Sequence, residues 1–159
     1  MRKYTTGLVI GRFQPFHLGH QYLIEKALFH AEKIIIGIGS SNIKDENNPY
    51  TIALREEFIK KFLEQENLTD KVERIVYIPD IPDDDEWYEI ANKLTGDVDV
   101  VIGDNEWVNG IYAKRDIPVI QIGYYKRNVL EGKKIRHQID HKKPWKTRVP
   151  KYLQKLIDR

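Results

Sequence analysis

Two histidines, His17 and His20, lie where a short apolar run gives way to a helical pattern. The run is Gly-Leu-Val-Ile at residues 7–10, and the helical pattern begins near Gly19. A helix start offers unpaired backbone N–H groups and the positive end of the helix dipole, which together favour phosphate. Imidazoles three residues apart can reach adjacent phosphate oxygens. We therefore expect a phosphate-binding turn, in which Gly19 lets the ligand approach the backbone closely.

The histidine pair also allows a structural role and a metal-binding role. The residues can form a helix cap with a satisfied structural histidine, which is the usual role of a lone histidine. They can also ligate zinc, but no third ligand is obvious nearby. The glycine and proline pattern around both histidines favours phosphate, and we expect no metal held by protein side chains.

The rest of the chain supplies alternating strand and helix patterns. Runs typical of buried parallel strands occupy residues 8–10, 34–38, 72–78, 98–102 and 119–122. Helical patterns occupy residues 19–30, 53–66 and 86–94, with a short helix after Asp104 and a final one over residues 145–157. This alternation predicts an α/β fold, a Rossmann-like doubly wound parallel sheet of about five strands with flanking helices. Such sheets bind ligands at the carboxyl ends of their strands, so we expect the site there.

Length and composition predict a single domain over residues 1–159, in which residues 126–159 form a basic loop and a C-terminal helical segment. With 41% hydrophobic residues, the chain can fill one core. It has no cysteine, which excludes disulfides, thiolate metal sites and thiol nucleophiles. It shows no signal peptide and no apolar stretch near the roughly 20 residues of a membrane helix. We expect a soluble, cytoplasmic protein with no membrane partner.

Charge is distributed unevenly along the chain. Residues 126–159 hold 12 basic and 3 acidic residues, a local charge of +9, which leaves −7 for the preceding residues because the total is +2. Anions are therefore expected at the C-terminal part. Three interpretations stay open: a solvated charged surface, a phosphate-binding region, or a nucleic-acid surface with Trp145 and Tyr152 as stacking groups.

The segment at residues 11–20 resembles the signature of the nucleotidylyltransferase superfamily, with the pattern G-x-F-x-P-x-H-x-G-H. The resemblance implies transfer of a nucleotidyl group from a nucleoside triphosphate to a phosphate monoester, by direct in-line attack with loss of pyrophosphate. It also implies that Mg²⁺ enters with the ATP and that His17 and His20 act on the triphosphate. The protein then supplies no nucleophile, and catalysis depends on positioning and charge stabilisation.

Further segments are similar to those of the archaeal-type nicotinamide-nucleotide adenylyltransferase family. They read G-S-S-N at 39–42, N-P-Y-T-I-A-L-R-E at 48–56, D-I-P-D-D-D-E-W at 80–87 and G-D-N-E-W-V at 103–108. The resemblance implies ATP and nicotinamide mononucleotide as substrates, NAD as product and a homo-oligomer, and we do not expect nucleic acid as a partner. It places Trp87 against the nicotinamide ring, where an indole face suits a cationic pyridinium. The acidic residues before Trp87 indicate a helix start and favour partial exposure, and a core position for Trp87 stays open as the alternative. Trp107 is expected in the core, with a second aromatic wall of the site as the alternative.

These segments together define the candidate site. The residues expected to act in catalysis are His17, His20 and Arg136. The residues expected to bind substrate are Gly11, Arg12, Phe13, Gly19, Ser40, Asn42, Arg55, Asp80, Trp87, Gly103, Asp104, Asn105, Arg127 and Lys133. Several positions also suit a structural role: Thr51 is a good helix cap, Asp104 and Asn105 are common turn residues, and Arg55 can be an exposed helix arginine.

The last motif of the family is altered in this chain. Where the family shows hydroxyl side chains and an arginine at a helix start, residues 130–137 read L-E-G-K-K-I-R-H. The glycine, isoleucine and arginine match, whereas Glu131 and Lys133 replace the hydroxyl residues. A lysine can hold a triphosphate as a point charge. A glutamate would repel phosphate unless it is paired with Lys134 or turned outward.

Three alternative functions stay open. Another adenylyltransferase of the superfamily, with phosphopantetheine or FMN as acceptor, shares the first motif, whereas cytidylyltransferases usually carry an R-T-x-G-I-S-T-T segment that is absent here. A non-catalytic nucleotide-binding regulatory module is supported only by Glu131 and Lys133. A nucleic-acid-binding protein would use the basic tail, and its affinity would depend steeply on salt.

Overall fold

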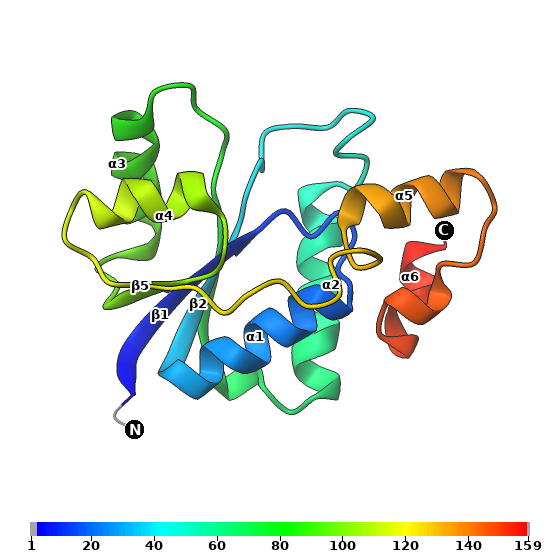
Figure 1. Cartoon of the computed structure of the whole chain (residues 1–159), viewed down its shortest axis with the longest axis horizontal. Coiled ribbons are helices and arrows are strands. Elements are labelled where there is room, and N and C mark those ends of the chain that lie inside the picture. Colours follow the sequence, from blue (N-terminus) through cyan, green and yellow to red (C-terminus); the bar gives the residue numbers. More distant parts are fainter. Residues whose placement is uncertain (1–2, 159) are drawn as a thin grey trace.

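The computed structural model describes residues 3–158, which contain one parallel sheet of five strands (Figure 1). The strands are β1 (Tyr4–Gly11), β2 (Ala31–Ile38), β3 (Val72–Tyr77), β4 (Val100–Ile102) and β5 (Val119–Ile120). Their order in the sheet is β3-β2-β1-β4-β5, and all pairings are parallel. The predicted Rossmann-like, doubly wound fold is therefore confirmed.

Helices connect successive strands and continue the chain after β5. They are α1 (Leu18–His30), α2 (Ile52–Gln65), α3 (Asp84–Thr95), α4 (Glu106–Ala113), α5 (Gly132–Asp140) and α6 (Gln154–Ile157), with 3₁₀ turns η1 (Thr69–Lys71), η2 (Lys146–Arg148) and η3 (Lys151–Leu153). Thr51 caps α2 as predicted, because its hydroxyl oxygen accepts a hydrogen bond from the Leu54 amide. Within residues 3–158, none of the helices is long and apolar enough to cross a lipid bilayer.

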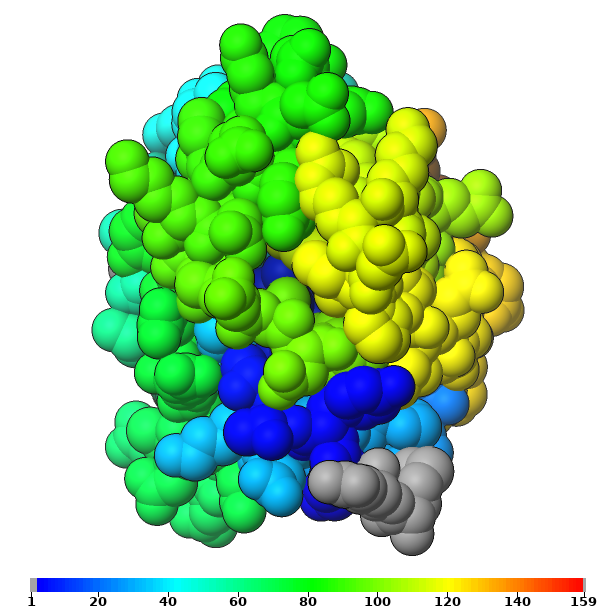
Figure 2. Space-filling view, turned by 90° about the vertical axis from the view of Figure 1, so that its left-hand side faces the viewer, coloured from blue at the N-terminus to red at the C-terminus, as the bar shows by residue number. Residues whose placement is uncertain are grey.

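The two faces of the sheet carry separate hydrophobic cores. Successive residues of β1 point to opposite sides, so Val9 belongs to the core under α1, α2, α5 and α6, whereas Leu8 belongs to the core under α3 and α4. Figure 1 shows these two groups of helices on opposite sides of the sheet. Seen from the α3 side, β1 (dark blue) is visible mainly near its start, because α3, α4 and the segment around β5 cover the sheet (Figure 2).

The strand order reverses at β1, which lies between β2 and β4. The segments that leave the carboxyl ends of β1 and β4 therefore lead to helices on opposite faces. Residues 11–17 leave β1 toward α1, and residues 103–105 leave β4 toward α4. Ligands of doubly wound sheets bind in the crevice between such segments.

The C-terminal segment differs from its prediction. A single final helix over residues 145–157 is wrong, since the chain forms η2, η3 and the short helix α6 instead. Pro150 lies between the two turns and has no N–H to donate, so a continuous helix would lose a hydrogen bond there. The apolar side chains are nevertheless buried, because Trp145, Val149 and Leu153 join the core that contains α2.

Candidate active site

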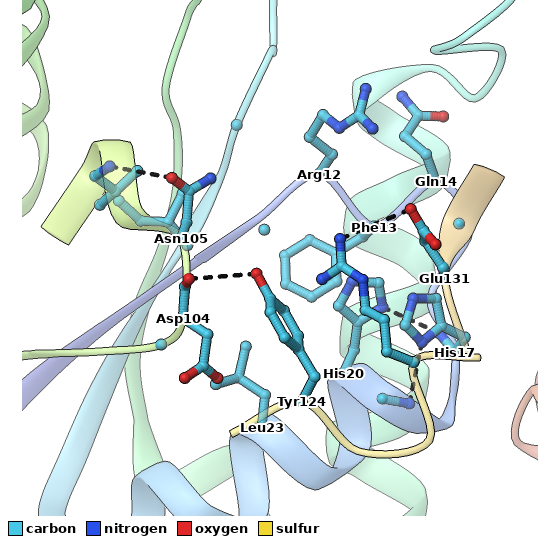
Figure 3. Close-up of a pocket in the computed structure, with 18 of the residues that line it drawn as sticks. Arg12, Phe13, Gln14, His17, His20, Leu23, Asp104, Asn105, Tyr124 and Glu131 are labelled. Atoms are coloured by element: carbon cyan, nitrogen blue, oxygen red, sulfur yellow. Dashed lines mark hydrogen bonds and ion pairs between the residues drawn. The ribbon is translucent and has the colours of Figure 1, made fainter. Parts of the chain in front are cut away.

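A cavity of about 480 Å³ opens at the carboxyl ends of the strands. Its walls come from the turn between β1 and α1, from the segments that follow the other strands, and from the start of α5. All of the predicted site residues line this cavity except Asn42 and Arg55. Figure 3 shows His17, His20 and Glu131 on one side of it, and Asp104 and Asn105 on the other.

Each histidine of the pair accepts a backbone hydrogen bond at Nδ1. His17 is the N-cap of α1, where its Nδ1 accepts from the Gly19 amide at 3.0 Å, and the His17 amide donates to His20 Nδ1 at 3.1 Å. The two rings are stacked with their centroids 3.8 Å apart. In a neutral imidazole the accepting nitrogen carries no proton, so both histidines carry their proton on Nε2.

Both imidazoles are held neutral by their surroundings. Burial and the nearby charge of Arg127 lower the pKa of His17 to about 3. Burial, together with His17 and the charge of Arg12, holds the pKa of His20 well below its usual value. The pair therefore presents two neutral N–H donors at the start of α1. Polyphosphate oxygens are suitable acceptors for these donors, and the helix dipole adds to the attraction.

Two glycines make room for polar side chains in this cavity. A Cβ on Gly19 would lie 2.7 Å from His17 Cε1 and 2.9 Å from its Nδ1, well inside ordinary contact distance. A Cβ on Gly132 would lie 3.0 Å from both Arg136 Nη1 and the Gln14 carbonyl oxygen. Those two atoms form a hydrogen bond of 2.7 Å. Side chains at either position would therefore displace the groups that line the cavity.

The start of α5 is a second helix end that can attract an anion to the cavity. Glu131 occupies its N-cap position but forms no capping hydrogen bond with its side chain. From this helix, Gly132, Lys133 and Arg136 line the cavity. The buried Arg136 is fixed by Gln14, which belongs to the turn that leads into α1. The starts of α1 and α5 therefore face one cavity.

Glu131 is paired with two basic side chains. Its Oε1 lies 3.7 Å from Arg127 Nη2, and its Oε2 lies 3.3 Å from Lys134 Nζ. Lys134 Nζ also donates to the Arg127 carbonyl oxygen at 3.0 Å. The pairing with Lys134 that a glutamate requires at this position is therefore present, and Arg127 takes part in it.

Arg55 lies outside the cavity lining and connects two of the turns that form it. The side chain is fully buried, and its guanidinium donates to the carbonyl oxygens of Arg12, Gly39 and Ser40. These residues belong to the turns after β1 and β2. Arg55 thus does not line the cavity, and the alternative of an exposed helix arginine is wrong because the side chain is fully buried. Arg55 positions the turns instead.

Asn42 also lies outside the cavity lining and connects two loops. Its Nδ2 donates to the Asp80 carbonyl oxygen, and its Oδ1 accepts from the Asp80 amide at 2.8 Å. Ser40 and Asp80, which do line the cavity, form a further hydrogen bond of 3.0 Å from Ser40 Oγ to Asp80 Oδ1. Asn42 therefore holds the loops after β2 and β3 together.

The two tryptophans near the cavity differ in exposure from what the sequence predicted. Trp87, expected to be partly exposed, is only 3% exposed and packs in the core under α3 and α4. Trp107, expected in the core, is 45% exposed, because Val108 and Tyr112 fill the inward face of α4. Its Nε1 donates to Asp84 Oδ1 at 2.9 Å. The two indoles meet edge to face at 5.0 Å, and both line the cavity.

Asp104 and Asn105 fix the loop after β4. Asn105 caps α4 by accepting from the Val108 amide at 3.1 Å. Asp104 Oδ1 accepts from the Gly123 amide at 3.0 Å, and the Tyr124 hydroxyl donates to the Asp104 carbonyl oxygen (Figure 3). Asp104 thus ties the loop after β4 to the segment after β5, while both residues line the cavity.

Several cavity residues were not predicted, namely Gln14, Tyr22, Asn109, Tyr124 and Tyr125. The side-chain oxygen of Gln14 accepts a hydrogen bond from the Tyr50 backbone amide at 3.0 Å, and its side-chain Nε2 donates to the Tyr50 carbonyl oxygen. These two bonds fix the loop before α2. Tyr22 and Tyr125 stack with their centroids 4.6 Å apart. The two tyrosines that follow Gly123 at the end of β5 had a signal in the sequence, since ligands bind at strand carboxyl ends.

The basic tail lacks the stacking groups proposed for a nucleic-acid surface. Trp145 is buried in the core, so the stacking role that the nucleic-acid alternative gave it is wrong. Tyr152 is half-buried, and its hydroxyl donates to Glu66 Oε1 at 2.9 Å. The structure thus removes the aromatic support for this alternative.

A family model described as cytidylyltransferase-like matches residues 8–138, which places the fold and the site in the nucleotidylyltransferase class. A nicotinamide-nucleotide adenylyltransferase from Thermoplasma acidophilum is 32% identical over 98% of this chain and 87% of its own length. Enzymes of the same name from Thermococcus kodakarensis and Halobacterium salinarum are 30% and 33% identical over 95% and 92% of this chain, and the chain covers 81% of each. The chain belongs to the cytidylyltransferase-like family and, within it, to the family of these nicotinamide-nucleotide adenylyltransferases.

Solved structures share the fold. A bifunctional NMN adenylyltransferase/ADP ribose pyrophosphatase from Francisella tularensis matches 98% of this chain with a TM-score of 0.79 and 26% identity. A second structure of that name, complexed with AMP and a manganese ion, matches 98% of the chain with a TM-score of 0.78 and 24% identity. The chain spans 50% of each of these longer proteins.

Proposed function

We propose that this chain transfers AMP from ATP to nicotinamide mononucleotide, giving NAD and pyrophosphate. The observation that carries the proposal is the neutral pair His17 and His20, whose Nε2–H donors lie at the start of α1 in a cavity that the start of α5 also lines. Family membership supports the same activity, since the relatives are nicotinamide-nucleotide adenylyltransferases.

In this reaction an oxygen of the mononucleotide phosphate attacks the α-phosphorus of ATP in line with the leaving group. A new P–O bond forms while the bond from the α-phosphorus to the bridging oxygen breaks, and its electron pair leaves with pyrophosphate. Negative charge grows on the leaving oxygens, where N–H donors and helix starts stabilise it. We assign this role to His17, His20 and Arg136. Catalysis then consists of positioning and electrostatic stabilisation, with no covalent enzyme intermediate.

The two substrates occupy opposite sides of the cavity in our proposal. The triphosphate lies against the turn at residues 11–20 that carries His17 and His20, called the histidine turn below, where Arg12, Arg127 and Lys133 add positive charge. The acceptor nucleotide lies toward Trp87 and Trp107, which both line the cavity, because the electron-rich face of an indole attracts a cationic nicotinamide ring.

We further propose that Mg²⁺ enters with ATP, as part of the substrate. Within residues 3–158, no group of three histidine, cysteine, aspartate or glutamate side chains is placed to hold a metal ion. A divalent ion on the triphosphate neutralises part of its charge.

The same proposal includes one domain over residues 1–159, a homo-oligomer and a cytoplasmic location. Support for the single domain comes from the C-terminal segment, whose Leu156 and Ile157 share a core with Phe58 of α2. The oligomer has the support of the family resemblance alone, and the location stays an expectation from the sequence.

The test is to incubate the purified chain with ATP, Mg²⁺ and nicotinamide mononucleotide, and to measure NAD and pyrophosphate. We expect equal amounts of the two products. Parallel incubations with nicotinic acid mononucleotide, FMN and phosphopantetheine define the acceptor. Binding of ATP without product from any acceptor would overturn the proposal and favour the non-catalytic module.

A further inference from the structure

Glu131 is the acidic residue on the basic side of the cavity. The cavity lining contains three carboxylates, of which Asp80 and Asp104 belong to the loops after β3 and β4. Glu131 instead lies at the start of α5, on the same side of the cavity as His17 (Figure 3). Its carboxylate therefore lies in the part of the cavity to which we assign the triphosphate.

The carboxylate holds Arg127 through a defined set of contacts. Arg127 Nη2 lies 3.7 Å from Glu131 Oε1, and the guanidinium lies over the Tyr124 ring at 3.9 Å from its centroid. Arg127 and His17 line the same cavity, and the charge of Arg127 also lowers the pKa of His17. Lys134 completes the arrangement at 3.3 Å from Glu131 Oε2. One carboxylate therefore engages two cations beside the phosphate-binding turn.

We propose that Glu131 is an internal counter-anion that competes with polyphosphate for Arg127. With no nucleotide bound, Glu131 balances the charge of Arg127 and Lys134. When the triphosphate enters, its oxygens displace the carboxylate from Arg127. After transfer, Glu131 forms the ion pair with Arg127 again, which weakens the binding of pyrophosphate. This inference rests on the proposed function and adds a residue that sets the affinity for ATP and pyrophosphate.

The physical reason is the balance of charges in a partly exposed pair. The side chains of Arg127 and Glu131 are 47% and 30% exposed, so the ion pair is weak enough to be displaced by a multiply charged anion. The negative charge of Glu131 also repels that anion directly. Removing the charge while keeping the shape, as in Glu131→Gln, therefore frees Arg127 and removes the repulsion.

The experiment measures binding of pyrophosphate with Mg²⁺ by titration calorimetry. We compare the unchanged chain with E131Q, E131A, R127Q and the double variant E131Q/R127Q, and use E89Q on the exposed surface of α3 as a control for net charge. E131Q and E131A are expected to bind pyrophosphate about tenfold more tightly, as a lost repulsion and a freed arginine together imply. The dissociation constant of E89Q for pyrophosphate is expected to stay within about twofold of that of the unchanged chain, since the charge of Glu89 is remote and screened.

The double variant separates competition for Arg127 from a general charge effect. In the R127Q background, Glu131→Gln is expected to change the dissociation constant of pyrophosphate by less than about threefold, because the cation for which Glu131 and pyrophosphate compete is absent. Steady-state rates provide a second readout: E131Q is expected to lower KM for ATP, and to lower kcat where pyrophosphate release limits turnover.

The outcomes of these titrations distinguish this inference from the proposed function. Equal or weaker pyrophosphate binding by E131Q and E131A overturns the counter-anion role, even if NAD is formed normally. An undiminished effect of Glu131→Gln in the R127Q background overturns the competition for Arg127. Absence of any pyrophosphate or ATP binding by the unchanged chain overturns both the inference and the proposed function.

Discussion

Gly19→Ala tests the placement of the histidine pair. The added Cβ would lie 2.7 Å from His17 Cε1, whereas ordinary contacts begin near 3.4 Å, so the His17 ring must move. Its movement breaks the hydrogen bond from the Gly19 amide to His17 Nδ1. This bond caps α1 and contributes about 1 kcal/mol to the unfolding free energy. Alanine in a helix gains about 1 kcal/mol over glycine. The two effects offset, and we expect a change in unfolding free energy below about 1 kcal/mol.

The activity of the same variant should fall steeply, because a displaced donor no longer meets the charge that develops during transfer. We expect kcat for NAD formation to drop about 100-fold or more. The matched control is Gly110→Ala in α4, where the added Cβ meets nothing within 4 Å. This control should gain up to about 1 kcal/mol and keep its activity. Urea unfolding and initial rates give both quantities, and G19A activity within threefold of the unchanged chain would refute the reasoning.

Three further predictions follow from burial and charge. First, Trp87→Ala should lower the unfolding free energy by about 3–5 kcal/mol, because the indole is buried. Trp107→Ala should lower it by less than about 1 kcal/mol and should raise KM for nicotinamide mononucleotide. The opposite order of the two losses in urea unfolding would contradict the structure. Second, Arg55→Met should cost about 3 kcal/mol or more, since three carbonyl oxygens lose their donor; a loss below 1 kcal/mol in urea unfolding would show that Arg55 does not hold the turns. Third, the pKa of His17 falls from 6.5 to about 3 on folding. Between these two pH values the unfolded chain binds more protons than the folded chain. The unfolding free energy therefore falls as the pH drops below about 6.5, by up to about 1.4 kcal/mol per pH unit. His17→Asn keeps a capping oxygen and removes this titration, so its unfolding free energy should fall less between pH 6 and pH 5; equal slopes would argue against a buried neutral His17.

The fold was predictable because buried parallel strands need apolar runs, and the runs are separated by helical patterns. The ends of the strands were less predictable, since pairing decides them. The strand predicted at residues 98–102 begins only at Val100, because its pairing with β1 joins Val100 and Val101 to Gly7 and Leu8. The last strand is likewise limited to Val119 and Ile120.

The histidine turn was predictable because its chemistry lies within ten consecutive residues. Arg55 could not be placed in the same way, since its three acceptors come from two other turns that only the folded sheet brings together. The exposure of Trp87 and Trp107 depends on the packing of α3 against α4, which sequence spacing does not give. For Glu131 the sequence indicated the need for a partner, and the structure added Arg127.

The central claim, that the neutral histidines act on the triphosphate during transfer, is tested most directly by His20→Ala. The measurement compares kcat for NAD formation with the dissociation constant of nicotinamide mononucleotide, for this variant and the unchanged chain. We predict a loss of about 100-fold to 1000-fold in kcat, as for the removal of a donor that stabilises developing charge, with the dissociation constant within about twofold. Equal losses in turnover and in mononucleotide binding would contradict the claim.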